Sequence, residues 1–280
     1  MKIQTISENS CFNGTQGVYQ HISKVLQCKM RFGVYIPPQA KRKHCPVLFW
    51  LSGLTCTEEN FIVKAGSQQY ASQYGFIVVA PDTSPRGIDI PNEEAYDIGQ
   101  GAGFYVDSTE PPWVSNYKMY SYITNELLDL VFTNFRAKQK RLGIFGHSMG
   151  GHGALIIALR NPETFQSVSA FAPITAPSSV PWGKKALGKY LGADSNRWKI
   201  WDATELIKSG KVHPKTILID QGTSDDFLTD QLRPEVFQNA CKKANQPIKL
   251  RLQRGYDHSY FFISSFIGDH FAHHAKLLAL

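Results

Sequence analysis

The sequence lacks long hydrophobic runs and has only five cysteines. No run approaches the ~18 apolar residues that a membrane-spanning helix needs, and the first ten residues hold no apolar stretch typical of a signal peptide. The cysteines are odd in number and scattered without a C-x-x-C pair, which argues against a disulfide framework or a zinc knuckle. Free thiols suit a reducing compartment. We therefore expect a cytoplasmic location and no membrane partner.

Charge is moderate, and no patterned cluster of charged or metal-binding residues is present. The 30 Lys and Arg against 23 Asp and Glu give a net charge of +7, but the basic clusters are short and accompany no nucleic-acid-binding module. There is no H-E-x-x-H and no histidine–carboxylate set at ligand spacing. We expect no nucleic-acid partner, no metal and no cofactor.

Short apolar runs recur along the chain and predict strands buried on both faces. They cover residues 46–51, 76–80, 142–145, 168–172, 217–219 and 248–252. Between them lie helical patterns, such as residues 117–135, whereas residues 30–36 alternate with a period of two that is typical of an antiparallel strand. We predict one α/β domain over residues 1–280, with a mostly parallel sheet, antiparallel N-terminal strands and helices on both faces.

Residues 82–115 form a long segment rich in Pro, Gly and Asp that fits no regular element. A loop this long in a compact domain is usually functional, so we expect it beside a binding site. Its aromatic residues Tyr96, Phe104, Tyr105 and Trp113 are equally compatible with the core and with a pocket wall. Residues 99–103 are glycine-rich but do not follow a strand as a dinucleotide-binding loop would.

The most informative motif is Gly146-His147-Ser148-Met149-Gly150, a G-x-S-x-G pentapeptide. It stands between a predicted buried strand and a predicted helix, the context of a nucleophile elbow. Such a turn needs neighbours almost without side chains, because strand and helix approach closely there. Ser148 is therefore the candidate nucleophile.

A serine nucleophile requires a histidine base and a carboxylate that orients it. In this type of hydrolase the acid and then the histidine follow the serine, each on a loop after a strand. His258 stands on the loop after residues 248–252. Asp225 and Asp226 both follow residues 217–219, and the residues alone leave open which of the two is the acid. Two weaker candidates are Asp220, inside the strand, and Asp257, beside the base.

Two backbone donors are needed for the negative charge that develops on the substrate oxygen. Met149, directly after the nucleophile, supplies one amide. The other is expected from the loop after residues 46–51, where Gly53 allows the backbone to turn so that the amide of Leu54 or its neighbour points inward. By spacing alone this loop is also compatible with an ordinary strand-to-helix turn.

Four blocks of sequence together resemble the S-formylglutathione hydrolase (esterase D) family of the α/β-hydrolase superfamily. They are residues 51–61, 146–154, 181–186 and 255–262, reading LSGLTCTEENF, GHSMGGHGA, PWGKKA and GYDHSYFF. The resemblance extends over nearly the whole chain and is far more specific than the elbow alone.

The resemblance implies a set of roles for the matching residues. Ser148 would be the nucleophile, His258 the base and Asp225 the acid, with the amides of Leu54 and Met149 as the oxyanion hole. The implied reaction is hydrolysis of S-formylglutathione to formate and glutathione through a formyl-serine, a step of formaldehyde detoxification. The resemblance also suggests a homodimer.

Further residues are candidates for substrate binding or regulation. Gly53, Trp182 and Lys184 are candidates for the pocket, since a mildly basic rim would suit the two carboxylates of glutathione. For Trp182 and Lys184 a surface turn anchored by a tryptophan is an equally good interpretation. Cys56 lies two residues after Leu54, and its oxidation could disturb the oxyanion loop unless the thiol is buried and inert.

Two other functions compete with the thioesterase. A carboxylesterase acting on short acyl esters would use the same residues, and the ratio of kcat/KM values for the two substrate types separates it. A noncatalytic binding protein of this fold would be marked by a missing member of the serine, histidine and acid set. None is missing, and only that class predicts that Ser148→Ala leaves function intact.

Overall fold

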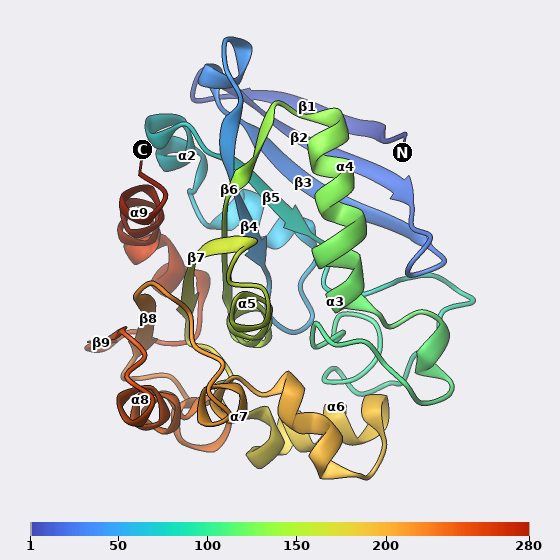
Figure 1. The fold of residues 1–280 in the computed structure, drawn as a ribbon. Helices are drawn as coiled ribbons and strands as arrows, with labels where there is room; N and C mark the ends of the chain where they lie inside the picture. The colour runs from blue at the N-terminus through green and yellow to red at the C-terminus, as the bar shows by residue number, and fades with distance from the viewer. Residues whose placement is uncertain (1, 280) are drawn as a thin grey trace.

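The computed structural model describes residues 2–279 and is organised around one large mixed β-sheet (Figure 1). In this part of the chain the sheet has nine strands in the order β1-β2-β3-β5-β4-β6-β7-β8-β9. Their bounds are β1 Gln4–Cys11, β2 Gly14–Ile22, β3 Lys29–Ile36, β4 Cys45–Leu51, β5 Ile77–Pro81, β6 Ala137–His147, β7 Phe165–Phe171, β8 Ile217–Gly222 and β9 Ile248–Gln253.

Strand direction divides the sheet into two parts. The first three strands are antiparallel, and β3 also pairs antiparallel with β5. From β5 onward every neighbouring pair is parallel. The central strands β4 and β5 are buried at every position, as their unbroken apolar sequences predict. The predicted mixed sheet is confirmed, although β1, a polar and largely exposed edge strand, gave no hydrophobic signal.

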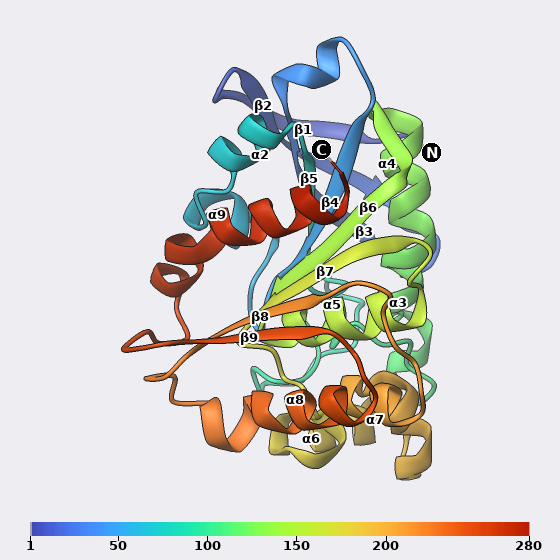
Figure 2. The same cartoon turned by 60° about the vertical axis from the view of Figure 1, so that its left-hand side comes forward.

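Helices cover both faces of the sheet, as predicted (Figure 2). On one face α2 and α9 pack together. On the other α4, α5 and α8 contact the sheet, α8 at the edge strand β9, and α7 packs against α5 and α8. The helices are α1 Glu58–Lys64, α2 Gln68–Tyr74, α3 Met119–Ser121, α4 Leu128–Asn134, α5 Met149–Arg160, α6 Pro181–Leu191, α7 Ala203–Lys208, α8 Pro234–Lys243 and α9 Tyr260–Leu277. Short 3-10 turns occupy Pro38–Lys41, Trp113–Ser115, Pro177–Ser179 and Ser195–Trp201, and π-helical turns occupy Tyr122–Leu127 and Leu228–Leu232.

Two predicted segments differ in detail from the structure. The helix expected over residues 117–135 is continuous from Met119 to Asn134, but its middle is the π-helical turn Tyr122–Leu127. The turn that was expected to hold Lys184 and Trp182 is the helix α6, which starts at Pro181, a residue favoured at the first helical position.

The long segment 82–115 is a loop whose regular structure is limited to the 3-10 turn at its end. Phe104, Tyr105 and Trp113 are buried and belong to the core, whereas Tyr96 is 57% exposed. Of the two predicted locations, the core therefore applies to Phe104, Tyr105 and Trp113, and a position outside the core applies to Tyr96. No helix within residues 2–279 is long and apolar enough to cross a bilayer.

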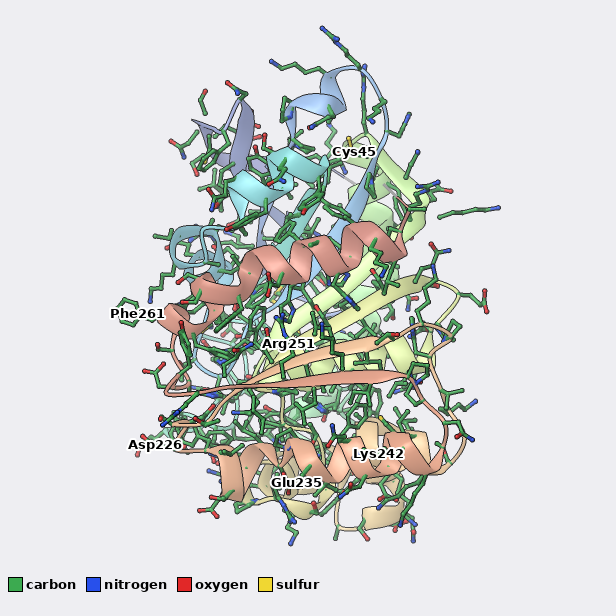
Figure 3. The ribbon with its side chains drawn as sticks, turned by 90° about the vertical axis from the view of Figure 1, so that its left-hand side faces the viewer. Cys45, Asp226, Glu235, Lys242, Arg251 and Phe261 are labelled. Atoms are coloured by element: carbon green, nitrogen blue, oxygen red, sulfur yellow. The ribbon has the colours of Figure 1, made fainter. Side chains whose placement is uncertain are left out.

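The parallel strands bring distant segments of sequence to one edge of the sheet. β4, β6, β8 and β9 run in the same direction, so the loops that follow them leave from the same edge. Figure 3 shows Asp226, after β8, and Phe261, at the start of α9, at the same side of the molecule. The loop after β4, the turn after β6 and the loops after β8 and β9 hold all the residues predicted for catalysis.

Candidate active site

Ser148 occupies a sharp turn between the end of β6 at His147 and the start of α5 at Met149. Its backbone has φ 57° and ψ −120°, a conformation that costs a non-glycine residue on the order of 1–3 kcal/mol. Glycine is required on both sides. A Cβ at Gly146 would lie 2.3 Å from the Gly150 carbonyl oxygen, and one at Gly150 would lie 1.9 Å from the Leu51 oxygen. The strained turn expected from the pentapeptide is present.

His258 and Asp225 are paired at the same edge of the sheet. His258 Nδ1 lies 2.6 Å from Asp225 Oδ2, which leaves Nε2 for another partner. Asp225 is buried and also accepts hydrogen bonds from the Gln221 side-chain amide and from the Phe227 backbone N–H. These contacts fix the carboxylate and, through it, the orientation of the imidazole ring.

The structure separates Asp225 from the other acidic candidates. Asp226 is exposed (Figure 3), and within residues 2–279 it forms no hydrogen bond or ion pair with His258. Asp257 is also exposed and accepts hydrogen bonds from the Ser259 hydroxyl and backbone N–H at the start of α9. Adjacent residues point in different directions, so the sequence left Asp225 and Asp226 unresolved and only the tertiary structure distinguishes them.

Asp220, the remaining acidic candidate, belongs to a second Asp–His–Ser chain in the protein core. Its Oδ2 lies 3.2 Å from His270 Nε2, and His270 Nδ1 lies 2.8 Å from the Ser169 hydroxyl. All three side chains are fully buried. Arg251 forms an ion pair with Asp220. Burial works to raise the pKa of Asp220, but hydrogen bonds from His270 and Arg251 lower it to about 2.

The 52–56 loop, which follows β4, approaches Ser148 from the side opposite the helix. A Cβ at Gly53 would lie only 3.2 Å from Ser148 Cβ, so Gly53 permits this approach. The N–H groups of Leu54 and Met149 donate to no acceptor within the described chain. Met149 is the first residue of α5, where backbone N–H groups have no partner inside the helix. Both predicted oxyanion-hole amides are thus free to bind a ligand oxygen.

A cavity of about 360 Å³ connects these groups. Gly53, Leu54, Cys56, Ser148 and His258 all line it, so the predicted residues come together in one place. Within residues 2–279 no hydrogen bond joins the Ser148 hydroxyl to His258, a contact that is often long in unliganded sites and shortens with substrate.

The two predicted pocket residues on α6 have different positions. Trp182 is a wall of the cavity: its indole N–H donates to the Tyr96 hydroxyl at 2.9 Å, and its ring packs against Phe227. Lys184 is exposed on α6 and does not line the cavity. The prediction for Lys184 as a pocket residue is therefore not supported, because the helical turn directs the two side chains differently.

Several cavity residues had no individual signal in the sequence. Asn60, Lys64 and Tyr260 line the cavity from α1 and from the start of α9. Tyr260 lies inside one of the blocks of family resemblance, so that block was the available signal. Asn60 also lies inside such a block, at residues 51–61. Lys64 lies outside every block and belongs to a helix whose direction only the fold reveals.

His147 also lines the cavity, with its ring centroid 4.3 Å from that of His258. Its Nε2 is buried and has no hydrogen-bond partner in the described part of the protein. Burial, and secondarily the neighbouring His258, lower the pKa of His147 well below its usual range. A neutral ring therefore packs against His258.

Cys56 is partly exposed and lines the cavity, so its thiol faces the candidate site. Burial is the largest influence on this thiol and raises its pKa, while Lys64 and Arg86 act in the opposite direction. The thiol is accessible but is not activated as a thiolate. Its predicted sensitivity to oxidation stays a prediction.

Comparison with known proteins places the chain in a family. The model of a family described as putative esterase matches residues 23–273. The chain is 56% identical to the S-formylglutathione hydrolase of Rattus norvegicus over 280 residues, covering 99% of both chains, and 53% identical to that of Paracoccus denitrificans, covering 98% of both. The chain belongs to the S-formylglutathione hydrolase family of esterases. The resemblance noted from the sequence is confirmed.

The solved structures agree with this assignment. An S-formylglutathione hydrolase from Agrobacterium tumefaciens superposes with a TM-score of 0.97 at 52% identity, covering 98% of this chain and 99% of the other. The predicted α/β-hydrolase fold is thereby confirmed. In residues 2–279 no group of three or more His, Cys, Asp or Glu side chains has the arrangement of a metal site.

Proposed function

We propose that this esterase hydrolyses S-formylglutathione to formate and glutathione. The observation that carries the proposal is His258, which is held by the buried Asp225 and lines one cavity with the strained Ser148. The chain is also more than half identical to named S-formylglutathione hydrolases over nearly its full length. The reaction would be a step of formaldehyde catabolism.

In the first step Ser148 Oγ attacks the formyl carbon and its proton passes to His258 Nε2. Asp225 holds Nδ1–H and stabilises the imidazolium that forms. The N–H groups of Leu54 and Met149 donate hydrogen bonds to the negatively charged formyl oxygen, and they require no reorganisation because they have no other acceptor within residues 2–279. The carbon–sulfur bond then breaks and leaves a formyl-serine.

The departing group is a thiol with a pKa of roughly 8.5, so it needs less protonation than an alcohol would. His258 supplies that proton and then accepts one from the water that attacks the formyl-serine. As the carbon–oxygen bond to Ser148 breaks, His258 returns this proton to Ser148 Oγ. Formate and free Ser148 result. His147 favours this cycle because a neutral neighbour adds no positive charge beside the imidazolium.

The test is thiol release from S-formylglutathione by the parent protein and by Ser148→Ala. We expect the variant to lose activity by a factor on the order of 10³ or more. Ser169→Ala, which removes the hydroxyl of the core chain, is the matched control and should retain activity. Thiol release by Ser148→Ala at the parent rate would refute the proposal.

The competing carboxylesterase activity uses the same cavity and is measured in the same experiment. We expect kcat/KM for S-formylglutathione to exceed that for short aryl esters, because the thioester combines a good leaving group with a larger recognition element. Higher kcat/KM for the aryl ester would favour the carboxylesterase function.

Two sequence-based predictions accompany this function. A cytoplasmic location is measured by cell fractionation, and a homodimer by analytical ultracentrifugation of the purified chain. Neither affects the chemistry proposed for Ser148.

A further inference from the structure

Lys64 is a cation at the candidate site with no carboxylate partner. It ends α1 and lines the cavity, where its ammonium lies 5.7 Å from the centroid of the Tyr260 ring. Other cations in this region are paired: Arg86 with Asp82, and Lys185 with Asp97. Within residues 2–279 Lys64 forms no ion pair, and the cavity lining contains no Asp or Glu. The cavity therefore offers an anion one uncompensated positive charge.

We propose that Lys64 binds a carboxylate of the glutathione moiety and so selects glutathione thioesters over neutral esters. The inference rests on the proposed function and deepens it. Lys64 is an exposed residue, and a lysine acts as a mobile point charge, so its ammonium can reach a carboxylate that enters the cavity. The cavity lining contains both the catalytic groups and this charge, which suits an acyl thioester with an anionic tail.

The test uses glutathione as a competitive inhibitor of aryl-ester hydrolysis, so that binding is measured apart from thioester chemistry. Lys64→Met should weaken inhibition by glutathione about tenfold, and inhibition by glutathione diethyl ester should be the same in variant and parent. Lys184→Met is the matched control, since Lys184 is exposed nearby on α6 but does not line the cavity, and its inhibition by glutathione should equal that of the parent.

Two outcomes would overturn this inference, and they are distinguishable. If Lys64→Met and the parent are inhibited equally by glutathione while the parent releases thiol from S-formylglutathione, the role of Lys64 is wrong and the proposed function stands. If the parent neither releases thiol nor is inhibited by glutathione, the proposed function fails and the inference fails with it.

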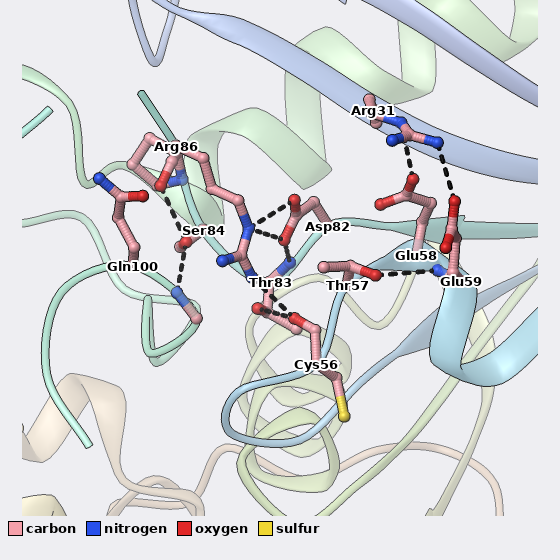
Figure 4. Close-up of polar contacts among 12 residues, drawn as sticks. Arg31, Cys56, Thr57, Glu58, Glu59, Asp82, Thr83, Ser84, Arg86 and Gln100 are labelled. Carbon is pink, nitrogen blue, oxygen red and sulfur yellow. Dashed lines mark hydrogen bonds and ion pairs between the residues drawn. The ribbon is translucent and has the colours of Figure 1, made fainter. Parts of the chain in front are cut away.

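A separate observation concerns the back of the 52–56 loop. The Cys56 carbonyl oxygen accepts two hydrogen bonds from the start of the 82–115 loop, one from the Thr83 hydroxyl at 2.6 Å and one from Arg86 at 3.0 Å (Figure 4). Arg86 is itself held by Asp82, whose Oδ2 lies 2.8 Å from Arg86 Nε. Asp82 is buried and also accepts from the Thr83 backbone N–H.

A second connection runs through Gly101. Its N–H donates to the Ser84 hydroxyl at 2.7 Å, and its carbonyl oxygen accepts from the Thr55 N–H at 2.9 Å. Gly101 has φ +86° and approaches Thr55 so closely that a Cβ would lie 3.1 Å from the Thr55 Cα. The 82–115 loop thus fixes the 52–56 loop on both Thr55 and Cys56, directly after Leu54.

We infer that the Asp82–Arg86 pair and Thr83 are positioning residues for the Leu54 amide. Thr55 has φ 67°, so the 52–56 loop is held in a conformation that a non-glycine residue rarely adopts. The hydrogen bonds at Cys56 and Thr55 supply the restraint that keeps it there. A donor aimed at a developing negative charge is effective only if it is fixed before the reaction.

The first test is Thr83→Val, which removes one hydrogen bond to Cys56 without changing charge. We expect kcat for aryl-ester hydrolysis to fall about threefold to tenfold with KM nearly unchanged, because the loss appears mainly in the transition state. The double variant Asp82→Asn/Arg86→Met should lower kcat by about tenfold to a hundredfold and leaves no unpaired buried charge.

The readout that separates positioning from general destabilisation is the affinity for a trifluoromethyl ketone, whose tetrahedral adduct places an oxyanion between the Leu54 and Met149 amides. Its affinity should fall in parallel with kcat. The double variant Arg31→Met/Glu58→Gln is the matched control, because it also leaves no unpaired buried charge and, within residues 2–279, neither side chain forms a hydrogen bond with the 52–56 loop (Figure 4). Unchanged kcat and adduct affinity in both test variants would overturn the inference whether or not S-formylglutathione is the substrate.

Discussion

Two Asp–His–Ser sets occur within residues 2–279. The acid of one, Asp220, is on β8, and the acid of the other, Asp225, follows that strand; only the second set has members that line the cavity at Ser148. Asp225 is hydrogen-bonded to His258, which lines the same cavity as Ser148, whereas Asp220, His270 and Ser169 are fully buried in the core. Both histidines bond to a carboxylate. The comparison shows that hydrogen-bond connectivity alone does not identify a catalytic site.

Three further features distinguish the set at Ser148. The serine stands on a strained turn, two unpaired amides lie beside it, and a cavity admits substrate. In the core set, by contrast, Ser169 also bonds to His274 and Asp220 is neutralised by Arg251. We therefore interpret the core set as structural. Asp220 on β8, His270 on α9 and Ser169 on β7 form a hydrogen-bonded chain. Because all of its polar groups have partners, this chain stabilises the packing of α9 on the two strands.

The largest expected effect is on catalysis, when the serine of each set is replaced in a separate variant. Ser148→Ala should lower kcat/KM for thioester hydrolysis by a factor on the order of 10⁴, since no other hydroxyl can replace the nucleophile. Ser169→Ala should remain within threefold of the parent. Steady-state thiol-release kinetics measure both. Comparable losses in the two variants would contradict the distinction between the sets.

The acids are expected to differ in the same way but by a smaller factor. Asp225→Asn should lower kcat about 10³-fold, because the neutral amide no longer fixes the tautomer of His258 or stabilises its charge. Asp220→Asn should leave kcat within threefold. If the kinetics instead reveal that Asp220→Asn is the more damaging change, Asp220 and not Asp225 would be the acid.

The core set is expected to contribute to the stability of the fold rather than to catalysis. Arg251→Met leaves the Asp220 carboxylate without its guanidinium partner in the core and should lower the free energy of unfolding by about 3–5 kcal/mol. Lys208→Met, which breaks the surface pair with Glu205, should cost less than about 1 kcal/mol. Urea denaturation curves measure the difference, and equal effects would show that the core pair is no stronger than a surface one.

The pH dependence gives a smaller effect in the same region. The pKa of Asp220 is about 2 in the folded protein and about 3.9 when unfolded, so its ionised form contributes about 2 kcal/mol above pH 4. This contribution is lost as the pH falls from about 4 to about 2. The stability difference between the parent and Asp220→Asn should shrink over that range. A difference that stays constant down to pH 2 would contradict the lowered pKa.

The smallest effect concerns two thiols, one at the cavity and one in the core. Cys56 faces the cavity, whereas Cys241 is buried in the core, where burial raises its pKa to about 12. Under a mild oxidant we expect Cys56→Ser to lose activity severalfold more slowly than the parent and Cys241→Ser to match the parent. Residual activity over time measures this, and equal inactivation of Cys56→Ser and parent would refute a role for Cys56.

The sequence by itself determined the fold class and most of the candidate site. Buried parallel strands require continuous apolar runs, which the sequence shows. The glycines around Ser148 indicate a tight turn, because no larger residue fits there. Order along the chain then led to His258 and to the pair Asp225 and Asp226. The family resemblance implied Asp225, and the comparisons confirmed the family.

Only the tertiary structure decided which side chains share the cavity. Asp226 points to solvent beside a buried Asp225, and Lys184 lies outside the cavity that Lys64 enters from α1. The edge strand β1 carried no hydrophobic signal, and the helical pattern of residues 117–135 did not reveal that residues 122–127 form a π-helical turn. The physical reason is common to these cases. Direction and burial of a side chain depend on the packing of elements far apart in sequence, which local pattern does not encode.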